Sequence, residues 1–378
     1  MENKTFDELL LPVRNDIDRI DKQLLQLFIE RMQCSERVAE IKRKAGIPVL
    51  NAAREQVILD RVRRDAGEYG DSAVALYSAI MSISRARQHT MLESGGALRA
   101  LEQNSPRALL ENPRIVCQGA PGAYSHSAAL RLFPGREPVF LPGFGDVFEA
   151  VRNGDGDYGV VPVENSDAGS VSEVYDLILR HRMYIVGAAD IPVRHCLCRA
   201  KGTGAVQKVI SKQEALAQCT SYLEQNGIAG EVFSNTAAAA RYVAENRPEG
   251  LGAVCSADAA RVYGLEILAE DIQNTDNNCT RFAVIAREAV LPGDADKISL
   301  CFSLPHTTGS LYRTLERFAL SGLNLTKIES RPIPGQNFEY DFYLDFTGNI
   351  HDERTLALIC ALSGEMPRFS FLGNYKES

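Results

Sequence analysis

Apolar residues recur at alternating spacings of three and four along the start of the chain, which is typical of the buried seam of one long helix. The seam positions are Leu10, Val13, Ile17, Ile20, Leu24 and Leu27. The next positions of the same count are Arg31, Cys34, Val38 and Ile41, so Arg31 stands where an apolar side chain is expected. A buried guanidinium is costly unless it is paired. We therefore expect a protein carboxylate or a ligand anion to meet Arg31.

Two other cations bear on this position. Lys42 follows Arg31 by close to three whole helical turns and shares its face. Arg14 precedes Arg31 by a separation that, at about 100° per residue, turns it far off that face. If Arg14 contributes to the same site, it must come from a second copy of the helix, which favours an intertwined dimer.

Two shorter helices are predicted to follow the first. Asn51 is a good N-cap for the second helix, which carries Arg54 and Glu55 in its first turns. Ser84 and Gln88 lie on one side of the third. A bundle with solvated surface charges is the better explanation of Arg54 and Glu55 alone, but it does not explain a cation in the seam.

Strands and helices alternate after residue 113, and one strand end is unusually polar. A buried strand at 158–163 leads into a loop with Glu164, Asn165 and Ser166, and a helical pattern opens at Gly169. Such strand ends, placed before a helix, are where open α/β sheets bind small anions. The alternative is a corner in which Glu164 and Asn165 only cap the helix.

A second polar strand end lies far downstream. Thr280 and Arg281 come just before the predicted strand 282–285. A second alternating unit lies between, and the chain then returns, which predicts two α/β lobes with a cleft between them. The pattern alone is explained equally well by a strand start with a surface arginine.

The last part of the chain follows the order βαββαβ, which is that of a ferredoxin-like module. The predicted strands are 297–304, 323–330, 339–346 and 368–372, with helices at 309–320 and 352–362. Modules of this kind usually bind a small molecule or pair side by side.

Composition narrows the classes of function. The chain has 378 residues, enough for two or three domains, and a net charge of −8, which argues against nucleic acid as the main partner. Its nine cysteines are scattered and odd in number, as expected of reduced thiols in a cytosol. We recognise no cleavable signal region and no apolar run of membrane-spanning length. We expect a cytoplasmic protein that uses no metal and no cofactor.

The segment Leu10–Gln88 resembles the all-α chorismate mutase domain. The resemblance implies rearrangement of chorismate to prephenate, in a site that holds a dicarboxylate compactly and stabilises charge on the breaking ether oxygen. It implies that Lys42 and Gln88 address that oxygen as catalytic residues. The implied substrate-binding residues are Arg14 (from the partner chain), Arg31, Arg54, Glu55 and Ser84. Asn51 stands where the family often has aspartate, which predicts a weaker contact with the substrate hydroxyl.

Gly119–His126, Val161–Ser166 and Asn278–Phe282 resemble the prephenate dehydratase domain, which is similar to the two-lobed periplasmic binding proteins. The resemblance implies decarboxylation of prephenate with loss of its ring hydroxyl, giving phenylpyruvate. Because aromatisation drives the reaction, the site mainly protonates the departing hydroxide and orients carboxylates. Thr280 is implied as the catalytic donor. The implied substrate-binding residues are Glu164, Asn165, Ser166, Gln218, Thr236, Arg281 and Phe282. Asn235 replaces a serine that usually precedes Thr236, so the resemblance does not predict the substrate contact of that serine here.

The stretches HTTGSLYRTL and KIESRP resemble the ACT regulatory domain, which binds amino acids. The resemblance implies feedback inhibition by phenylalanine through a closed, less active oligomer. The implied effector-binding residues are Gly309, Ser310, Leu311, Glu329, Ser330, Arg331 and Pro332.

The sequence thus predicts a multidomain, bifunctional enzyme of phenylalanine biosynthesis. We expect an all-helical chorismate mutase domain at 1–100, a two-lobed α/β dehydratase domain at 113–288 and a ferredoxin-like ACT domain at 296–376. The expected ligands are chorismate, prephenate and the effector L-phenylalanine, and the expected assembly is at least a homodimer. Three alternatives remain: a ligand sensor with silent catalytic centres, a protein whose dehydratase alone works, and an enzyme that prefers arogenate to prephenate.

Overall fold

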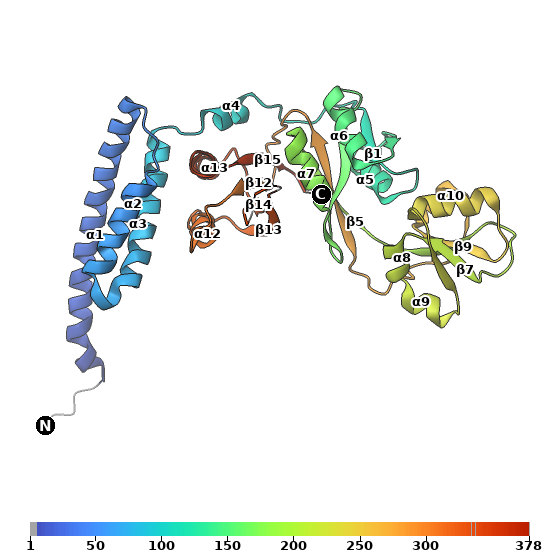
Figure 1. Ribbon diagram of the computed structural model, residues 1–378, viewed down its shortest axis with the longest axis horizontal. Coiled ribbons are helices and arrows are strands. Elements are labelled where there is room, and N and C mark those ends of the chain that lie inside the picture. The colour runs from blue at the N-terminus through green and yellow to red at the C-terminus, as the bar shows by residue number, and fades with distance from the viewer. Residues whose placement is uncertain (1–5, 334, 337, 378) are drawn as a thin grey trace.

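The computed structural model describes residues 6–333, 335–336 and 338–377. Figure 1 shows a group of long helices at one end of the molecule and two α/β lobes at the other. A four-stranded sheet with helices α12 and α13 lies between these two parts.

The N-terminal part is helical, as predicted. Its helices are α1 (Phe6–Ala45), α2 (Ala52–Asp65) and α3 (Gly70–Met91). Helix α2 begins at the predicted cap, where the Asn51 side chain accepts the Arg54 N–H. Helix α3 packs against both α1 and α2.

The predicted seam of α1 is not the face that α2 and α3 cover, because its residues Val38 and Ile41 are 42% and 66% exposed. The buried residues of α1 are Ser35 and Ala39, both in its C-terminal half. Closer to the N-terminus, Val13 and Leu24 are each 54% exposed, and Leu27 near the middle of the helix is 61% exposed. The apolar seam therefore extends beyond what α2 and α3 of the same chain can cover.

The segment after α3 contains helix α4 (Gly96–Asn104), and the first lobe begins after it. The sheet of this lobe has the order β2-β1-β3-β11-β5, with the short β4 paired to β3. Its elements are β1 (Ile115–Gln118), α5 (Tyr124–Leu132), β2 (Val139–Leu141), α6 (Phe144–Asn153), β3 (Tyr158–Asn165), β4 (Gly169–Ser170), α7 (Ser172–His181), β5 (Tyr184–Pro192) and β11 (Cys279–Ala286). The helical pattern expected to open at Gly169 starts instead at Ser172, because Gly169 and Ser170 pair with β3.

The second lobe is built around a sheet of order β10-β6-β9-β7-β8. Its elements are β6 (Cys196–Arg199), β7 (Lys208–Ser211), α8 (Gln213–Ala217), α9 (Thr220–Gln225), β8 (Ala229–Val232), α10 (Thr236–Asn246), β9 (Leu251–Cys255), α11 (Ala257–Val262) and β10 (Glu266–Ala269). The lobes meet at Gly122, which has φ +81° and whose Cβ, if present, would lie 2.6 Å from Ala259 Cα. Only glycine permits this approach.

The C-terminal part follows the predicted βαββαβ order, with a sheet of order β13-β14-β12-β15. Its elements are β12 (Lys297–Ser303), α12 (Ser310–Leu320), β13 (Leu325–Pro332), β14 (Tyr340–Thr347), α13 (Glu353–Glu365) and β15 (Ser370–Tyr375). One face of this sheet docks on the first lobe: Cys301, Tyr343 and Leu372 share a hydrophobic cluster with Val163 and Ile185.

Candidate functional site

The helical part carries a cavity of about 320 Å³ between α1, α2 and α3, and this cavity is open to solvent on one side. Its lining combines cations, carboxamides, hydroxyls and one carboxylate with apolar side chains. The lining residues are Arg31, Cys34, Ser35, Val38, Lys42, Val49, Asn51, Arg54, Glu55, Ile58, Met81, Ser84, Arg85 and Gln88. The structure therefore brings together six of the seven residues predicted for the first site.

Arg31 contacts a hydroxyl at the cavity wall, and the ion pairs of the described residues do not include it. Its Nη1 donates to Ser84 Oγ at 2.7 Å, and a hydroxyl does not neutralise a guanidinium. Gln88 Nε2 donates to Ser35 Oγ at 3.0 Å, and Ser35 Oγ donates to the Ser84 carbonyl at 3.3 Å. These bonds fix the Gln88 side chain, whose Oε1 is buried and has no hydrogen-bond partner among the described residues.

Lys42 enters the cavity from the end of α1 and donates to the Val49 carbonyl. Burial lowers the pKa of Lys42 below the ordinary lysine value, and the negative charge of Glu55 partly offsets this effect. Glu55 is itself held by Arg85, whose Nη1 lies 2.6 and 2.5 Å from its two carboxylate oxygens. The cavity thus presents Arg31 and Lys42 beside one carboxylate, Glu55, which Arg85 restrains.

Arg14 lies outside this cavity. It is separated from Arg31 by roughly 25 Å along the axis of α1, and it forms an exposed ion pair with Asp7 at 3.4 Å. Asn51 and Arg54 lie at the exposed edge of the cavity, where the Asn51 side chain is already occupied in capping α2.

The two polar strand ends of the first lobe meet, because β3 and β11 are antiparallel neighbours with Asn165 opposite Thr280. Asn165 Nδ2 lies 2.8 Å from Thr280 Oγ1 and 2.7 Å from Asn278 Oδ1. Ser166 Oγ accepts the Cys279 N–H at 3.0 Å. Asn278 is 3% exposed, and its Nδ2 has no hydrogen-bond partner among the described residues. A hydroxyl and two amides are therefore fixed at one point.

Glu164 and Arg281 point away from this cluster, contrary to the prediction that both line the cleft. The register shifts between Arg281 and Phe282, which leaves Val163 without a partner residue on β11. Such a bulge changes the face to which the neighbouring side chains point. Glu164 consequently lies 3.4 Å from Lys327 of β13, on the side of the C-terminal sheet.

Arg281 is already paired on that same side. Its guanidinium lies 2.9 and 3.0 Å from the two carboxylate oxygens of Asp190, and its Nε is 2.7 Å from Glu377. Phe282 is 3% exposed and packs in a hydrophobic cluster with Tyr158 and Val284. This burial argues against a substrate contact by Phe282, and the ion pairs argue against a free carboxylate-binding role for Arg281.

The second lobe contributes two predicted residues at helix termini. Gln218 follows the end of α8, and its Oε1 lies 3.0 Å from Nε2 of the buried His195. Thr236 begins α10, and the preceding Asn235 accepts the Ala238 N–H at 2.7 Å. Asn235 is thus a working N-cap, a role for which serine and asparagine are about equally suited.

The predicted effector residues fall on two segments. Gly309 caps α12 with φ +77°, and Ser310 Oγ donates to the Thr307 carbonyl at 2.9 Å, with Leu311 following in the first turn of α12. On β13, Glu329 lies 3.5 Å from Lys327, and Arg331 lies 3.3 Å from Asp176 of the first lobe. Ser330 and Pro332 alternate with them and are exposed.

Several residues at these sites were not found from the sequence. Asn278 is preceded by another asparagine, and no sequence pattern marks it as functional apart from its place near Thr280. Arg85 is one arginine of a basic stretch on α3, and Lys327 resembles an ordinary edge-strand lysine. Glu365 lies far from the helical segment in sequence, and only the packing of α13 brings it to α3.

Membrane-spanning helices and metal-binding groups are both absent from the described part of the chain. None of the helices there combines the length and apolar character that crossing a membrane requires. Those residues also contain no group of three or more His, Cys, Asp or Glu placed to hold a metal ion.

Comparison with known proteins assigns two parts of the chain to a class of protein. Residues 13–89 match the chorismate mutase type II family, and residues 115–290 match the prephenate dehydratase family. A solved prephenate dehydratase from Arthrobacter aurescens in complex with L-Phe superposes with a TM-score of 0.64 at 30% identity, covering 70% of this chain and 90% of that chain. Arogenate dehydratase 2 of Petunia hybrida is 40% identical over 280 residues, which are 69% of this chain and 71% of that protein.

One relative matches along the whole length. The bifunctional chorismate mutase/prephenate dehydratase of Aquifex aeolicus is 36% identical over 376 residues, covering 98% of this chain and 99% of that protein. The chain belongs to the bifunctional chorismate mutase/prephenate dehydratase family. It rearranges chorismate to prephenate and then converts prephenate to phenylpyruvate, carbon dioxide and water, two steps of phenylalanine biosynthesis.

Proposed function

We propose that the mutase reaction takes place in the cavity between α1, α2 and α3. The observation that carries this proposal is the pair of cations, Arg31 and Lys42, lining one cavity. Arg31 would hold a substrate carboxylate, while Lys42 and Gln88 would donate to the ether oxygen as negative charge develops there. Glu55 would contact the substrate hydroxyl, and Ser84 and Arg54 would lie near the second carboxylate.

We further propose that Arg14 completes this cavity from a second copy of the chain. The exposed apolar seam of α1 supports this proposal, because a soluble helix seldom leaves such a surface uncovered. Pairing of two α1 helices would bury the seam and carry Arg14 toward the partner's cavity. The assembly would then be at least a homodimer.

For the dehydratase reaction, we propose the cluster of Thr280, Asn165, Ser166 and Asn278 as the reaction centre. Thr280 Oγ1 would donate a hydrogen bond to the departing hydroxide, and Asn165 would hold Thr280 in the required rotamer. Gln218 and Thr236 would contact the substrate from the second lobe. Because the product ring is aromatic, orientation and a proton source are the main requirements.

The same cluster is compatible with arogenate as a substrate, since arogenate differs from prephenate by an amino group in place of the side-chain keto group. The similarity to an arogenate dehydratase of Petunia hybrida favours including this second candidate. A comparison of kcat/KM for the two substrates on one protein preparation would distinguish them.

We propose that the C-terminal part, residues 296–376, is a ferredoxin-like ACT domain that binds L-phenylalanine and lowers the activity. Its βαββαβ order and the relative solved with L-Phe support this role. The remaining domains would be the mutase at 1–100 and the dehydratase at 113–288. Gly309–Leu311 and Glu329–Pro332 would come together across a pair of chains.

The experiment that tests the assignment is a crossover of two substitutions. Lys42→Ala should abolish chorismate consumption and leave the conversion of prephenate to phenylpyruvate intact. Thr280→Val, which keeps the shape and removes the hydroxyl, should do the reverse and lower dehydratase kcat by roughly 10²- to 10⁴-fold. Both activities are measured on each purified protein, with and without L-phenylalanine.

Thr280→Ser serves as the matched control, because it retains the hydroxyl and should keep most of the dehydratase activity. A Lys42→Ala protein that still consumes chorismate at the normal rate would contradict the cavity assignment. Unmodified protein that turns over neither substrate would favour the ligand sensor.

A further inference from the structure

The mutase cavity is connected to the C-terminal part of the molecule through Arg85. This residue lies on α3, lines the cavity, and has a side chain that is only 14% exposed. Its Nη1 contacts both carboxylate oxygens of Glu55, at 2.6 and 2.5 Å. Its Nε lies 3.3 Å from Oε2 of Glu365, the last residue of α13, at ion-pair distance but outside hydrogen-bond geometry.

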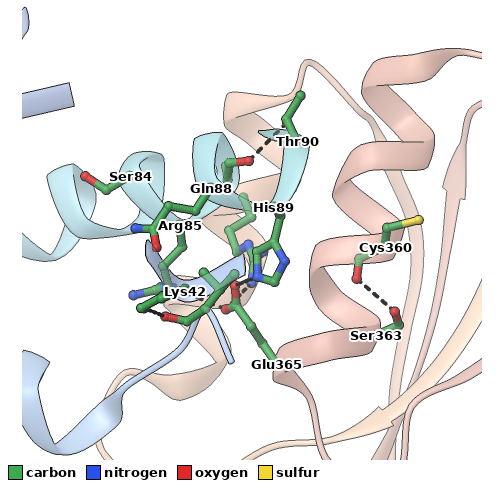
Figure 2. Close-up of polar contacts among 12 residues, drawn as sticks. Lys42, Ser84, Arg85, Gln88, His89, Thr90, Cys360, Ser363 and Glu365 are labelled. Atoms are coloured by element: carbon green, nitrogen blue, oxygen red, sulfur yellow. Dashed lines mark hydrogen bonds and ion pairs between the residues drawn. The ribbon is translucent and has the colours of Figure 1, made fainter. Parts of the chain in front are cut away.

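Glu365 is built into a buried junction of three helices. Its side chain is 4% exposed, and Figure 2 shows it extending from α13 toward His89 of α3. Oε1 lies 2.8 Å from His89 Nε2, and Oε2 accepts a hydrogen bond from Arg317 Nη1 at 2.9 Å. Burial opposes ionisation of Glu365, but the His89 hydrogen bond and the charges of Arg317 and Arg85 outweigh it and keep the pKa of Glu365 below its ordinary value.

We propose that Arg85 is a positioning residue for the mutase reaction, which holds Glu55 at the cavity wall and is itself fixed by Glu365 of the C-terminal part. This inference rests on the proposed role of Glu55 in substrate binding. One guanidinium touches both carboxylates, so a displacement of α13 is transmitted to Glu55 through the single side chain of Arg85. The mutase site is therefore completed by a residue from the opposite end of the sequence.

Loss of Arg85 is expected to affect catalysis because Glu55 is also close enough to act on Lys42. Its charge already acts on Lys42, the cation expected at the ether oxygen. Released from Arg85, the Glu55 carboxylate would be attracted to Lys42 and would compete with the negative charge that Lys42 must stabilise. The loss should appear mainly in kcat for chorismate, with a smaller change in KM.

The experiment measures mutase and dehydratase kinetics on the full chain carrying single substitutions. Arg85→Leu should lower mutase kcat/KM about tenfold, and Glu365→Gln should lower it about threefold because it acts through Arg85. Arg85→Lys should be intermediate, since an ammonium can meet one carboxylate but cannot span two. Dehydratase kinetics should be unchanged in all three, which also verifies that the chain is folded.

Glu353→Gln is the matched control. Glu353 is also on α13, but its partner is Arg99 of α4, at 2.9 Å, away from the mutase cavity. The Glu353→Gln substitution should leave mutase kinetics unchanged.

If Arg85 only stabilises the fold, Arg85→Leu and Glu365→Gln should lower the melting temperature and leave mutase kcat and KM normal. This result would overturn the inference. The variant Glu55→Gln separates this failure from a failure of the proposed site. If Glu55→Gln leaves the mutase unaffected, the assignment of Glu55 is wrong. If it lowers mutase activity while Arg85→Leu and Glu365→Gln do not, the assignment stands and the connection through Arg85 is wrong.

Discussion

At the residue scale, the surroundings of each charged side chain determine whether it can serve a ligand. Arg31 and Arg281 are both arginines predicted to hold a carboxylate. Arg31 donates to the Ser84 hydroxyl and keeps its charge for an incoming anion. Arg281 is bound by Asp190 and Glu377, so a substrate carboxylate would have to displace two protein carboxylates. The same residue type is thus available at one site and occupied at the other.

A pH prediction follows from Lys42. Its pKa is lowered below 10.5 because burial disfavours the ammonium, and the Glu55 charge offsets part of this effect. The proposed role of Lys42 needs the charged form, so mutase kcat/KM should fall as the pH rises through the lowered pKa. Removing the offset in Glu55→Gln should lower the pKa of Lys42 further and move the alkaline limb to lower pH.

The measurement is the pH profile of chorismate consumption for both proteins, with the prephenate profile of the same samples as control. An alkaline limb at the same pH in Glu55→Gln would show that a group other than Lys42 controls it.

At the scale of the element, a single register shift decides which strand residues gather at the proposed dehydratase centre. The bulge at Val163 turns Glu164 toward the C-terminal sheet and leaves Asn165 opposite Thr280. Alternation along β3, without knowledge of its partner, cannot reveal this shift. The helical cap at Asn51 depends on local sequence alone and was predicted correctly.

The approach of β15 to β5 gives a stability prediction. A Cβ at Gly373 would lie 2.0 Å from the Ile185 carbonyl oxygen, so Gly373→Ala must push the C-terminal sheet away from the first lobe. We expect a loss of at least about 2 kcal/mol in the free energy of unfolding, typical of overpacking against backbone. Chemical denaturation of the two proteins measures it.

Gly293→Ala is the control for this experiment, since a Cβ there meets no atom within 4 Å. Equal stability of the Gly373→Ala protein and the unmodified chain would show that the two parts are not docked as described.

At the scale of the whole molecule, the C-terminal part contacts both catalytic parts. Its sheet shares a hydrophobic cluster with the first lobe, and its helix α13 joins the ionic junction beside the mutase cavity. An effector bound to this part could therefore influence both activities through packing that already exists. The uncovered seam of α1 adds a third surface, toward a second chain.

Exchange of Arg14 between chains can be tested by complementation. Arg14→Ala and Lys42→Ala should each inactivate the mutase. In a mixed dimer one cavity carries both changes and the other carries neither, so coexpression should restore about a quarter of the normal mutase activity, the statistical share of intact sites in dimers formed at random. Chorismate consumption by the mixed, purified protein provides the measurement.

If Arg14 instead acts in its own chain, each cavity of the mixed dimer retains one defect and no activity returns. Dehydratase activity, which neither substitution touches, normalises the protein concentration in every sample.

The sequence alone was sufficient for features that depend on neighbouring residues: the long first helix, the cap at Asn51, the alternating α/β pattern and the βαββαβ order of the tail. Periodicity and capping are local, so they can be recognised without the fold. The tertiary structure alone decided that Glu164 and Arg281 face the C-terminal sheet, and that Glu365 reaches Arg85 across 280 positions of the chain. Contacts of this kind depend on strand register and on the docking of distant elements, which local sequence patterns do not encode.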